Sequence, residues 1–129
     1  MKLTLREIVE QGRIDELVAK AESGDANAQV MVGDLYFYPV RGMENMDCDI
    51  ARQWYQKAAN QNHPRGIEQL AFVYQLGYSK DGKIIFHSDK EKARELYEKA
   101  AALGSVSAKE RLEKLMAREA QSNSDERGE

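Results

Sequence analysis

Two segments of this 129-residue chain repeat nearly the same residues, and internal repetition constrains a fold more than any other sequence feature. Residues 51–59 read Ala-Arg-Gln-Trp-Tyr-Gln-Lys-Ala-Ala, and residues 93–101 read Ala-Arg-Glu-Leu-Tyr-Glu-Lys-Ala-Ala. The segments before them, residues 24–36 and 62–74, also align, and a partial third copy begins at Gly104. Each copy is long enough for two helices, so the sequence predicts a stack of helix pairs.

Small and apolar residues in the first helix of each copy recur at the spacing of one buried helical face. Ala28, Val32 and Leu35 show this spacing in the first copy. Gly33 falls in the middle of the same helix, where glycine costs about 1 kcal/mol relative to alanine. We therefore expect a neighbouring helix to approach closely at Gly33, and Ala71 repeats the small residue in the second copy.

The boundaries between helix pairs carry residues that are typical of helix ends. Gly24, Asn62 and Gly104 each follow an Ala-rich helix end, and glycine or asparagine suits the left-handed backbone of a C-terminal cap. Pro64 suits the first turn of the next helix because its missing N–H group has no helical partner there. These residues predict where one helix pair meets the next.

A serine or threonine followed three residues later by glutamate predicts a capping box at the start of a helix. Thr4 with Glu7 opens an N-terminal segment, residues 4–23, that forms one helix or two helices interrupted near Gly12. Ser88 shows the same spacing to a glutamate, so we expect it to open the second helix of the second copy.

A short β-hairpin is predicted between the two helices of the second copy. Asp81-Gly82 lies between two β-prone stretches, which is a common signal for a two-residue hairpin turn. The apolar residues 84–86 either pack back on the repeat or form an exposed apolar patch. The loop of residues 37–46 poses the same two alternatives.

Composition and charge exclude several classes of partner. The chain has 19 basic and 22 acidic residues, a net charge of −3, so it has no global attraction for nucleic acid or anionic lipid. Charges interrupt any apolar run in residues 1–10, which predicts neither a signal peptide nor a membrane span there. The single Cys48 has no partner for an internal disulfide. We expect a cytoplasmic protein that binds neither nucleic acid nor membranes.

The residues that carry chemistry form no recognisable catalytic or metal-binding pattern. His63 and His87 have no Cys, Asp or Glu arranged around them at ligand spacing. No nucleophile elbow, phosphate loop or paired-carboxylate arrangement is recognisable either. Trp54 with Tyr55 either packs in the core or forms a platform for a ligand. We therefore expect no catalytic residue, no metal and no cofactor, and predict that the protein is not an enzyme.

The repeated residues resemble the Sel-one-like repeat (SLR) family, which belongs to the tetratricopeptide-type superfamily of helical repeats. The family pattern runs Gly, alternating Ala, Leu-Gly-x-Leu-Tyr, a loop, Asp, and Ala-x-x-Trp-Tyr-x-Lys-Ala-Ala. In the first copy this pattern is met by Gly24, Ala26, Ala28, Gly33, Leu35, Tyr36, Asp47, Ala51, Trp54, Tyr55, Lys57, Ala58 and Ala59. In the second copy it is met by Tyr74, Gly77, Asp89, Ala93, Tyr97, Lys99, Ala100, Ala101 and Gly104.

The resemblance implies an all-α fold, a short right-handed α-solenoid of antiparallel helix pairs with the small β-hairpin as an insertion. It also implies that Trp54 and Tyr55 pack between helices of adjacent layers rather than forming a platform for a ligand. We expect a single helical-repeat domain over residues 1–118, with an N-terminal helical cap before the repeats. Its parts are two full repeats at about 24–61 and 62–103 and a terminal half-repeat, 104–118, which forms a capping helix. Residues 119–129, which are almost entirely polar, are expected to form a disordered tail.

The first helix of each pair lines the concave side of such a solenoid, and residues offset by one from the buried set should point into it. This rule predicts a partner-binding surface of Asn27, Met31, Asp34, Arg65, Gln69, Phe72 and Arg111. Phe72 is the best candidate for an apolar anchor of a bound segment, and the alternative is that it is another core residue.

The repeats and the lack of a catalytic pattern favour a non-enzymatic protein–protein interaction module, such as an adaptor, a regulatory protein or an immunity-type protein. Its partner would be a segment of another protein, bound on the concave face. The alternative is a small-molecule binder or enzyme, with a pocket between the groove and the loops that carry Tyr38, Tyr78 and His87. A self-associating subunit is a third hypothesis.

Overall fold

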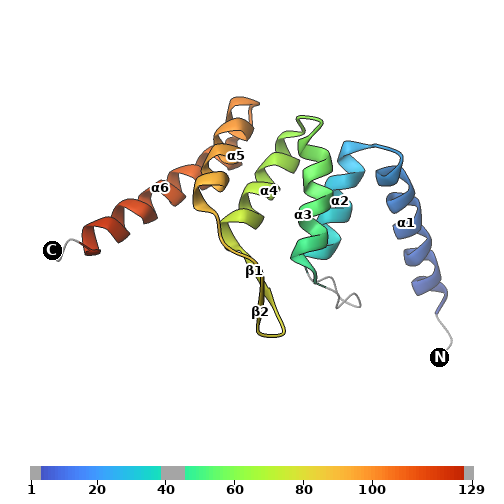
Figure 1. Ribbon diagram of the computed structural model, residues 1–129. Helices are drawn as coiled ribbons and strands as arrows, with labels where there is room; N and C mark the ends of the chain where they lie inside the picture. The colour runs from blue at the N-terminus through green and yellow to red at the C-terminus, as the bar shows by residue number, and fades with distance from the viewer. Residues whose placement is uncertain (1–3, 39–45, 127–129) are drawn as a thin grey trace.

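The computed structural model describes residues 4–38 and 46–126, and over these residues the chain forms a stack of six helices with one β-hairpin (Figure 1). In chain order the elements are α1 (Leu5–Glu22), α2 (Ala26–Phe37), α3 (Cys48–Ala59), α4 (Pro64–Leu76), β1 (Tyr78–Lys80), β2 (Lys83–Phe86), α5 (Lys90–Ala102) and α6 (Val106–Glu126). The predicted all-α solenoid of helix pairs, with its small β-hairpin insertion, is confirmed.

The helices pack in chain order, each against the next, from α1 at one end of the stack to α6 at the other (Figure 1). Helix α2 also touches α4, and it does so more closely than α3 touches α5. The helices are therefore closer together on the side of α2, α4 and α6, where Arg111 of α6 also reaches Gln69 of α4. We call these three the inner helices, and α1, α3 and α5 the outer helices.

All three outer helices end in the same hydrogen-bonded turn. At each turn a backbone N–H group donates to the carbonyl oxygen five residues earlier: Asp25 to Lys20 (3.2 Å), His63 to Ala58 (3.2 Å) and Ser105 to Ala100 (3.0 Å). The residue before each donor has the left-handed backbone predicted for it: Gly24 (φ 109°), Asn62 (φ 59°) and Gly104 (φ 101°). Lys20, Ala58 and Ala100 are therefore equivalent positions, and α1 belongs to the same series as α3 and α5.

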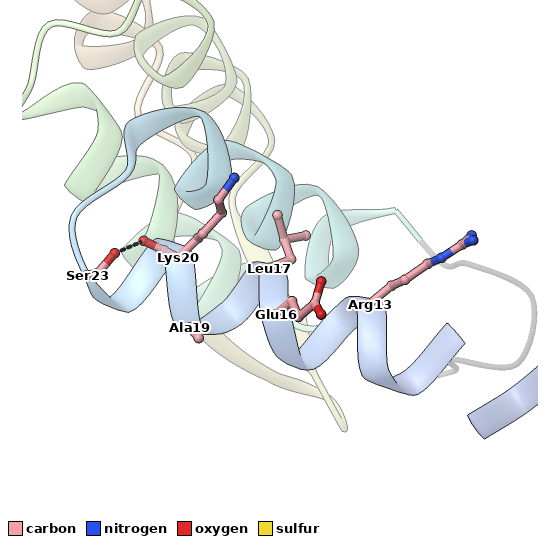
Figure 2. Close-up of a pocket in the computed structure, with 6 residues that line it drawn as sticks. All are labelled: Arg13, Glu16, Leu17, Ala19, Lys20 and Ser23. Carbon is pink, nitrogen blue, oxygen red and sulfur yellow. Dashed lines mark hydrogen bonds between the residues drawn. The ribbon is translucent and has the colours of Figure 1, made fainter. Parts of the chain in front are cut away.

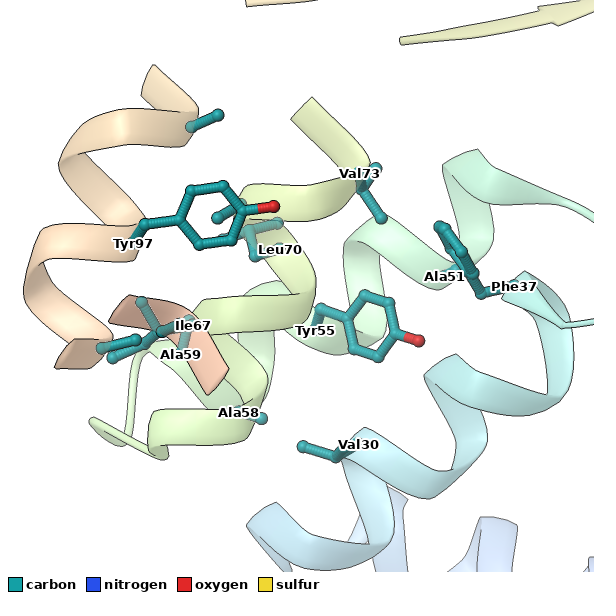
Figure 3. Packing of buried hydrophobic residues seen from close by; sticks show 14 of the residues in the cluster. Val30, Phe37, Ala51, Tyr55, Ala58, Ala59, Ile67, Leu70, Val73 and Tyr97 are labelled. Atoms are coloured by element: carbon teal, nitrogen blue, oxygen red, sulfur yellow. The ribbon is translucent and has the colours of Figure 1, made fainter. Parts of the chain in front are cut away.

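Large and small side chains fit together between the helices of the first repeat. Tyr55 on α3 is fully buried, and a Cβ atom built at Gly33 on α2 would lie only 2.5 Å from its ring. The close approach predicted at Gly33 is thus made by this tyrosine. Tyr97 on α5 is buried in the same way in the second repeat, and both rings lie in one core cluster (Figure 3).

Trp54 is half-buried, and it packs as the sequence predicts rather than standing open as a platform. Its ring lies against the small cluster of Ala21, Ala28 and Val32 that joins α1 to α2. The ammonium group of Lys57 lies 4.4 Å from the ring centroid, within the range of a cation–π contact. Trp54 thereby ties α3 to the first two helices.

One of the two predicted capping boxes is present and the other is wrong. Thr4 and Glu7 cap each other's backbone at the start of α1. The N-cap of α5 is Asp89, whose carboxylate accepts from the Lys92 N–H group at 3.0 Å. Ser88 instead donates its hydroxyl to a carbonyl oxygen of α4 at 2.7 Å, because it lies one residue too early for the cap. Helix α1 also runs through Gly12 without interruption.

The predicted β-hairpin forms, with Asp81 and Gly82 at its turn and positive φ angles of 52° and 78°. Of its apolar residues, Phe86 packs back on Tyr74 of α4, with 6.3 Å between ring centroids. The neighbouring Ile84 and Ile85 are 59% and 47% exposed. Phe86 therefore packs back on the repeat, whereas Ile84 and Ile85 are exposed apolar residues. In the other long loop, residues 39–45 lie outside the described residues.

Helix α6 continues to Glu126, which differs from the disordered tail predicted from residue 119 onward. A helix that already exists is extended cheaply, because each added residue forms one more backbone hydrogen bond without a new nucleation step, even where it buries no apolar surface. Glu119 also reaches back to α5, with its carboxylate 3.9 Å from the Arg94 guanidinium. Residues 127–129 lie outside the described residues, and the domain limits remain predictions.

Candidate partner-binding face

The residues predicted to face the groove do lie on the inner helices, and five of the seven form one connected cluster. Asp34 on α2, Arg65, Gln69 and Phe72 on α4, and Arg111 on α6 are joined by direct contacts. Asn27 and Met31 lie nearer the N-terminus of α2, outside this cluster. We call the surface formed by these seven residues the inner face.

Gln69 is the centre of the cluster, and it is only 3% exposed. Its amide nitrogen lies 3.3 Å from the Asp34 carboxylate and 3.1 Å from the Tyr38 hydroxyl, while its amide oxygen accepts from Arg111 at 3.0 Å. A buried amide needs such partners on both of its ends. Gln69 therefore links the three inner helices from below the surface, and it does not present itself to a partner as the sequence rule assumed.

Asp34 holds one side of the cluster together. Its carboxylate accepts from the buried Tyr55 hydroxyl and lies 3.3 Å from the guanidinium of Arg65. Burial raises the pKa of Tyr55 far above its ordinary value, and the hydrogen bond to Asp34 adds to the rise. The hydroxyl thus remains a donor, and Asp34 connects the core to the exposed Arg65.

Glu68 belongs to this cluster although the sequence analysis did not select it. It is 5% exposed, and its carboxylate accepts from the hydroxyls of Ser105 (2.7 Å) and Ser107 (2.6 Å). The Arg111 guanidinium lies 3.2 Å from its other oxygen. A signal was present in the alignment, because Glu68 stands where the first copy has the apolar Val30.

The ring of Phe72 contacts two neighbouring side chains. The Arg111 guanidinium lies 4.6 Å from the centroid of its ring, and the ring of Phe37 lies 5.7 Å from it. Phe72 is therefore half-buried, and a partner would meet its edge together with the cation above it. These contacts place part of the ring in the core, and its role as an anchor stays a prediction.

The exposed members of the inner face are Met31, Asn27 and Arg65. Met31 is 53% exposed and the Arg65 side chain is 62% exposed. The Asn27 amide oxygen accepts from His63 Nε2 at 2.6 Å, because His63 Nδ1 already accepts the Gly66 N–H group that caps α4. These residues place an apolar, an amide and a cationic side chain on one surface.

Two hollows of the described surface lie away from the inner face, along α1. One depression of about 620 Å³ is lined by Arg13, Glu16, Leu17, Ala19, Lys20 and Ser23 (Figure 2). A second, of about 460 Å³, is lined by Leu5, Arg6, Val9, Glu10 and Arg13. Neither of these two depressions lies between the inner face and the loops with Tyr38, Tyr78 and His87.

Two features are absent from the described ranges, 4–38 and 46–126. No group of three or more His, Cys, Asp or Glu side chains there is arranged to hold a metal ion. No helix in this part of the chain has the length and apolar character needed to cross a membrane.

Comparison with known proteins matches the architecture described above. The model of the family described as "Sel1 repeat" fits residues 26–63 and 70–105, more than half of the chain. The chain belongs to the Sel1 repeat family. Proteins of this family generally mediate protein–protein interactions. The two matches fall on the two repeats recognised in the sequence.

Individual relatives are longer proteins. The ERAD-associated E3 ubiquitin-protein ligase component HRD3A of Arabidopsis thaliana is 34% identical over 58 residues, which is 45% of this chain and 8% of HRD3A. The protective antigen c5321 of uropathogenic Escherichia coli, which displays an SLR fold, superposes with a TM-score of 0.66 and 26% identity over 79% of this chain and 20% of its own. A Sel1 repeat protein from Oxalobacter formigenes superposes with a TM-score of 0.61 and 31% sequence identity. The match covers 76% of this chain and 37% of that protein. This chain therefore spans a small part of each.

Proposed function

We propose that this Sel1 repeat protein is a non-enzymatic, cytoplasmic interaction module that binds a segment of another protein on its inner face. An adaptor, a regulatory protein or an immunity-type protein would each work in this way. The binding mode would be that of a short groove, because the described part of the chain contributes three inner helices to the surface.

The observation that carries the proposal is the hydrogen-bonded cluster across the three inner helices. Gln69 and Glu68 lie buried under the surface and hold Arg111, while Asp34 holds Arg65. Side chains fixed in this way lose little conformational freedom when a partner binds, which raises affinity. An unsupported surface arginine would lose far more.

The exposed groups indicate the chemistry of the partner segment. Asp34 and Glu68 are already engaged with the two arginines, and each guanidinium keeps N–H donors beyond those contacts. Lys114 adds a further exposed cation on α6, and Met31 offers an adaptable apolar contact. A segment with one or two carboxylates next to an apolar side chain fits this surface.

The test is a screen of a displayed peptide library on the wild-type protein, with calorimetric measurement of the peptides it enriches. Met31→Glu and Arg65→Ala should each weaken binding at least about tenfold, which corresponds to about 1.4 kcal/mol. Lys99→Glu, an exposed change on the outer helix α5, is the matched control and should leave the affinity unchanged.

Thermal unfolding of each variant separates lost binding from lost structure. Met31 is half exposed, so its substitution should leave the transition where the wild-type protein has it. Enriched peptides that bind both inner-face variants as tightly as the wild type would overturn the assignment of this face. A screen that enriches no peptide dependent on Met31 or Arg65 would do the same.

A further inference from the structure

We propose that the protein self-associates head to tail, with α6 of one copy packed against α1 of the next copy. Each complete repeat pairs an inner helix with the outer helix that follows it: α2 with α3, and α4 with α5. Over the described residues, α6 is the last inner helix and α1 is the first outer helix, so each has one side on which this stretch of chain places no further helix. Together they would form one more repeat, and the stack would continue into the second copy.

The register of α1 shows which of its residues would meet that inner helix. The matching turns make Lys20 equivalent to Ala58, so that Leu17 corresponds to Tyr55 and Arg13 to Ala51. The three residues on α3 are fully buried, and Tyr55 packs directly against Gly33 of the preceding inner helix. On α1 the same three positions line the larger depression, and they lie along one stretch of the helix (Figure 2). The depression therefore lies where an inner helix would pack against α1.

The register of α6 gives the opposing residues. Gly33 aligns with Ala71, 38 residues on, and then with Glu113, a further 42 residues on. By the same offsets Val30 corresponds to Glu110, and Phe37 corresponds to Ala117. All three residues of α6 are exposed.

Side-chain sizes are exchanged between the complete repeat and the proposed one. The repeat pairs the small Gly33 with the large Tyr55, whereas the proposed contact pairs the larger Glu113 with the smaller Leu17. Phe37 and Ala51, which share a buried cluster, pair a large residue of the inner helix with a small residue of the outer helix. In the proposed contact the inner helix has the small Ala117, and the outer helix has the large Arg13. At these two positions the space left by one helix is thus matched by the other.

The charges at the aligned positions of the two faces are complementary. Glu113 would lie over Leu17, with Arg13 and Lys20 about one helical turn to either side of it. Val30 and Ala58 lie in one buried cluster in the complete repeat. In the proposed contact Glu110 takes the position of Val30, and Lys20 takes the position of Ala58. These charges on α1 and α6 disfavour the packing of an apolar helix on either face. They favour packing of the α6 face of one copy on the α1 face of another. The inner face takes no part in this contact, so the inference stands independently of the proposed function.

The test measures the mass of the full chain in solution by sedimentation over a concentration series. The wild type should grow from one chain to two and then to more, because a head-to-tail contact leaves a free face at each end. The association should weaken as salt rises from about 0.15 M to about 1 M, where the screening length falls from about 8 Å to about 3 Å.

Charge reversal then identifies the two faces. Arg13→Glu with Lys20→Glu reverses α1, and Glu110→Lys with Glu113→Lys reverses α6. All four residues are exposed, so both variants should fold, and each alone should stay at the mass of one chain. An equimolar mixture of the two should associate again, because each reversed face meets an opposite charge. Lys99→Glu is the control and should associate like the wild type.

Each failure has a definite meaning. A wild type that keeps the mass of one chain throughout the series would overturn the proposal. Association that survives both reversals would place the contact elsewhere on the molecule, and a mixture that fails to associate would reject the pairing of α1 with α6. Circular dichroism of each variant confirms that helical structure is retained.

Discussion

Gly33 and Gly12 each occupy the middle of a helix, and their surroundings show how the centre of this stack differs from its end. A Cβ atom at Gly33 would collide with the buried ring of Tyr55, whereas a Cβ atom at Gly12 on α1 would meet nothing within 4 Å. The centre of the stack depends on large and small side chains that fit together. The end helix instead exposes Leu5, Ile8 and Val9 and packs mainly on α2.

The largest effect is expected from removing the aromatic half of the central contact. Tyr55→Ala should lower the free energy of unfolding by about 3–5 kcal/mol, because it leaves a cavity between α2, α3 and α4 and removes the hydroxyl that Asp34 binds. Denaturant unfolding followed by circular dichroism measures the change. Tyr55→Phe keeps the ring and loses the hydrogen bond, so it should recover most of the loss. A loss below about 1 kcal/mol for the alanine variant would show that the centre is loosely packed.

The glycine half of the same contact is expected to have the next largest effect. Gly33→Ala should destabilise the protein by about 1–3 kcal/mol, because the buried Tyr55 ring has no room to move away from the added methyl group. The gain in helix propensity, about 1 kcal/mol, offsets only part of this strain. The same unfolding measurement checks it, and a stabilised variant would contradict the packing described here.

The contrast between centre and end also explains what the sequence could predict. The repeat, the helix ends at Gly24 and Asn62, the hairpin turn and the close approach at Gly33 were all predictable, because each follows from periodicity or from local backbone chemistry. The burial of Gln69 was not, because the rule of offset positions treats all inner residues alike. Its burial depends on Arg111, which reaches it from another helix.

The choice of Asp89 over Ser88 as N-cap, and the length of α6, were missed for a related reason. Both depend on competition between alternatives of similar energy, such as two capping residues side by side or a polar helix against a disordered tail. Nearby contacts decide such cases, among them the Ser88 hydrogen bond to α4 and the approach of Glu119 to Arg94. A single sequence records the candidates but not the neighbours that select among them.

The buried tyrosines make the stability of the centre depend on alkaline pH. Burial raises the pKa of Tyr97 to about 12, above its unfolded value of about 10. Between these values the unfolded chain loses the proton first, so stability is full below about pH 10 and falls as the pH rises toward 12. The expected slope is at most about 1 kcal/mol per pH unit from this residue.

Denaturant unfolding at several pH values checks that slope. Tyr97→Phe removes the titrating group, so its stability should fall less steeply over the same window, although it loses the hydrogen bond to Gln75 at every pH. Equal slopes for the wild type and the variant would show that the Tyr97 hydroxyl reaches solvent.

The smallest effect is expected at the end of the stack, and it has the opposite sign. Gly12→Ala should stabilise the protein by about 0.5–1 kcal/mol, because alanine restricts the unfolded chain and favours α1, while its methyl group meets open space. The comparison with Gly33→Ala is matched, since both substitutions add one methyl group in the middle of a helix. If Gly12→Ala were instead destabilising, α1 would have to pack against something at that point. Repeating the measurement at low and high protein concentration would show whether that neighbour is α6 of a second copy.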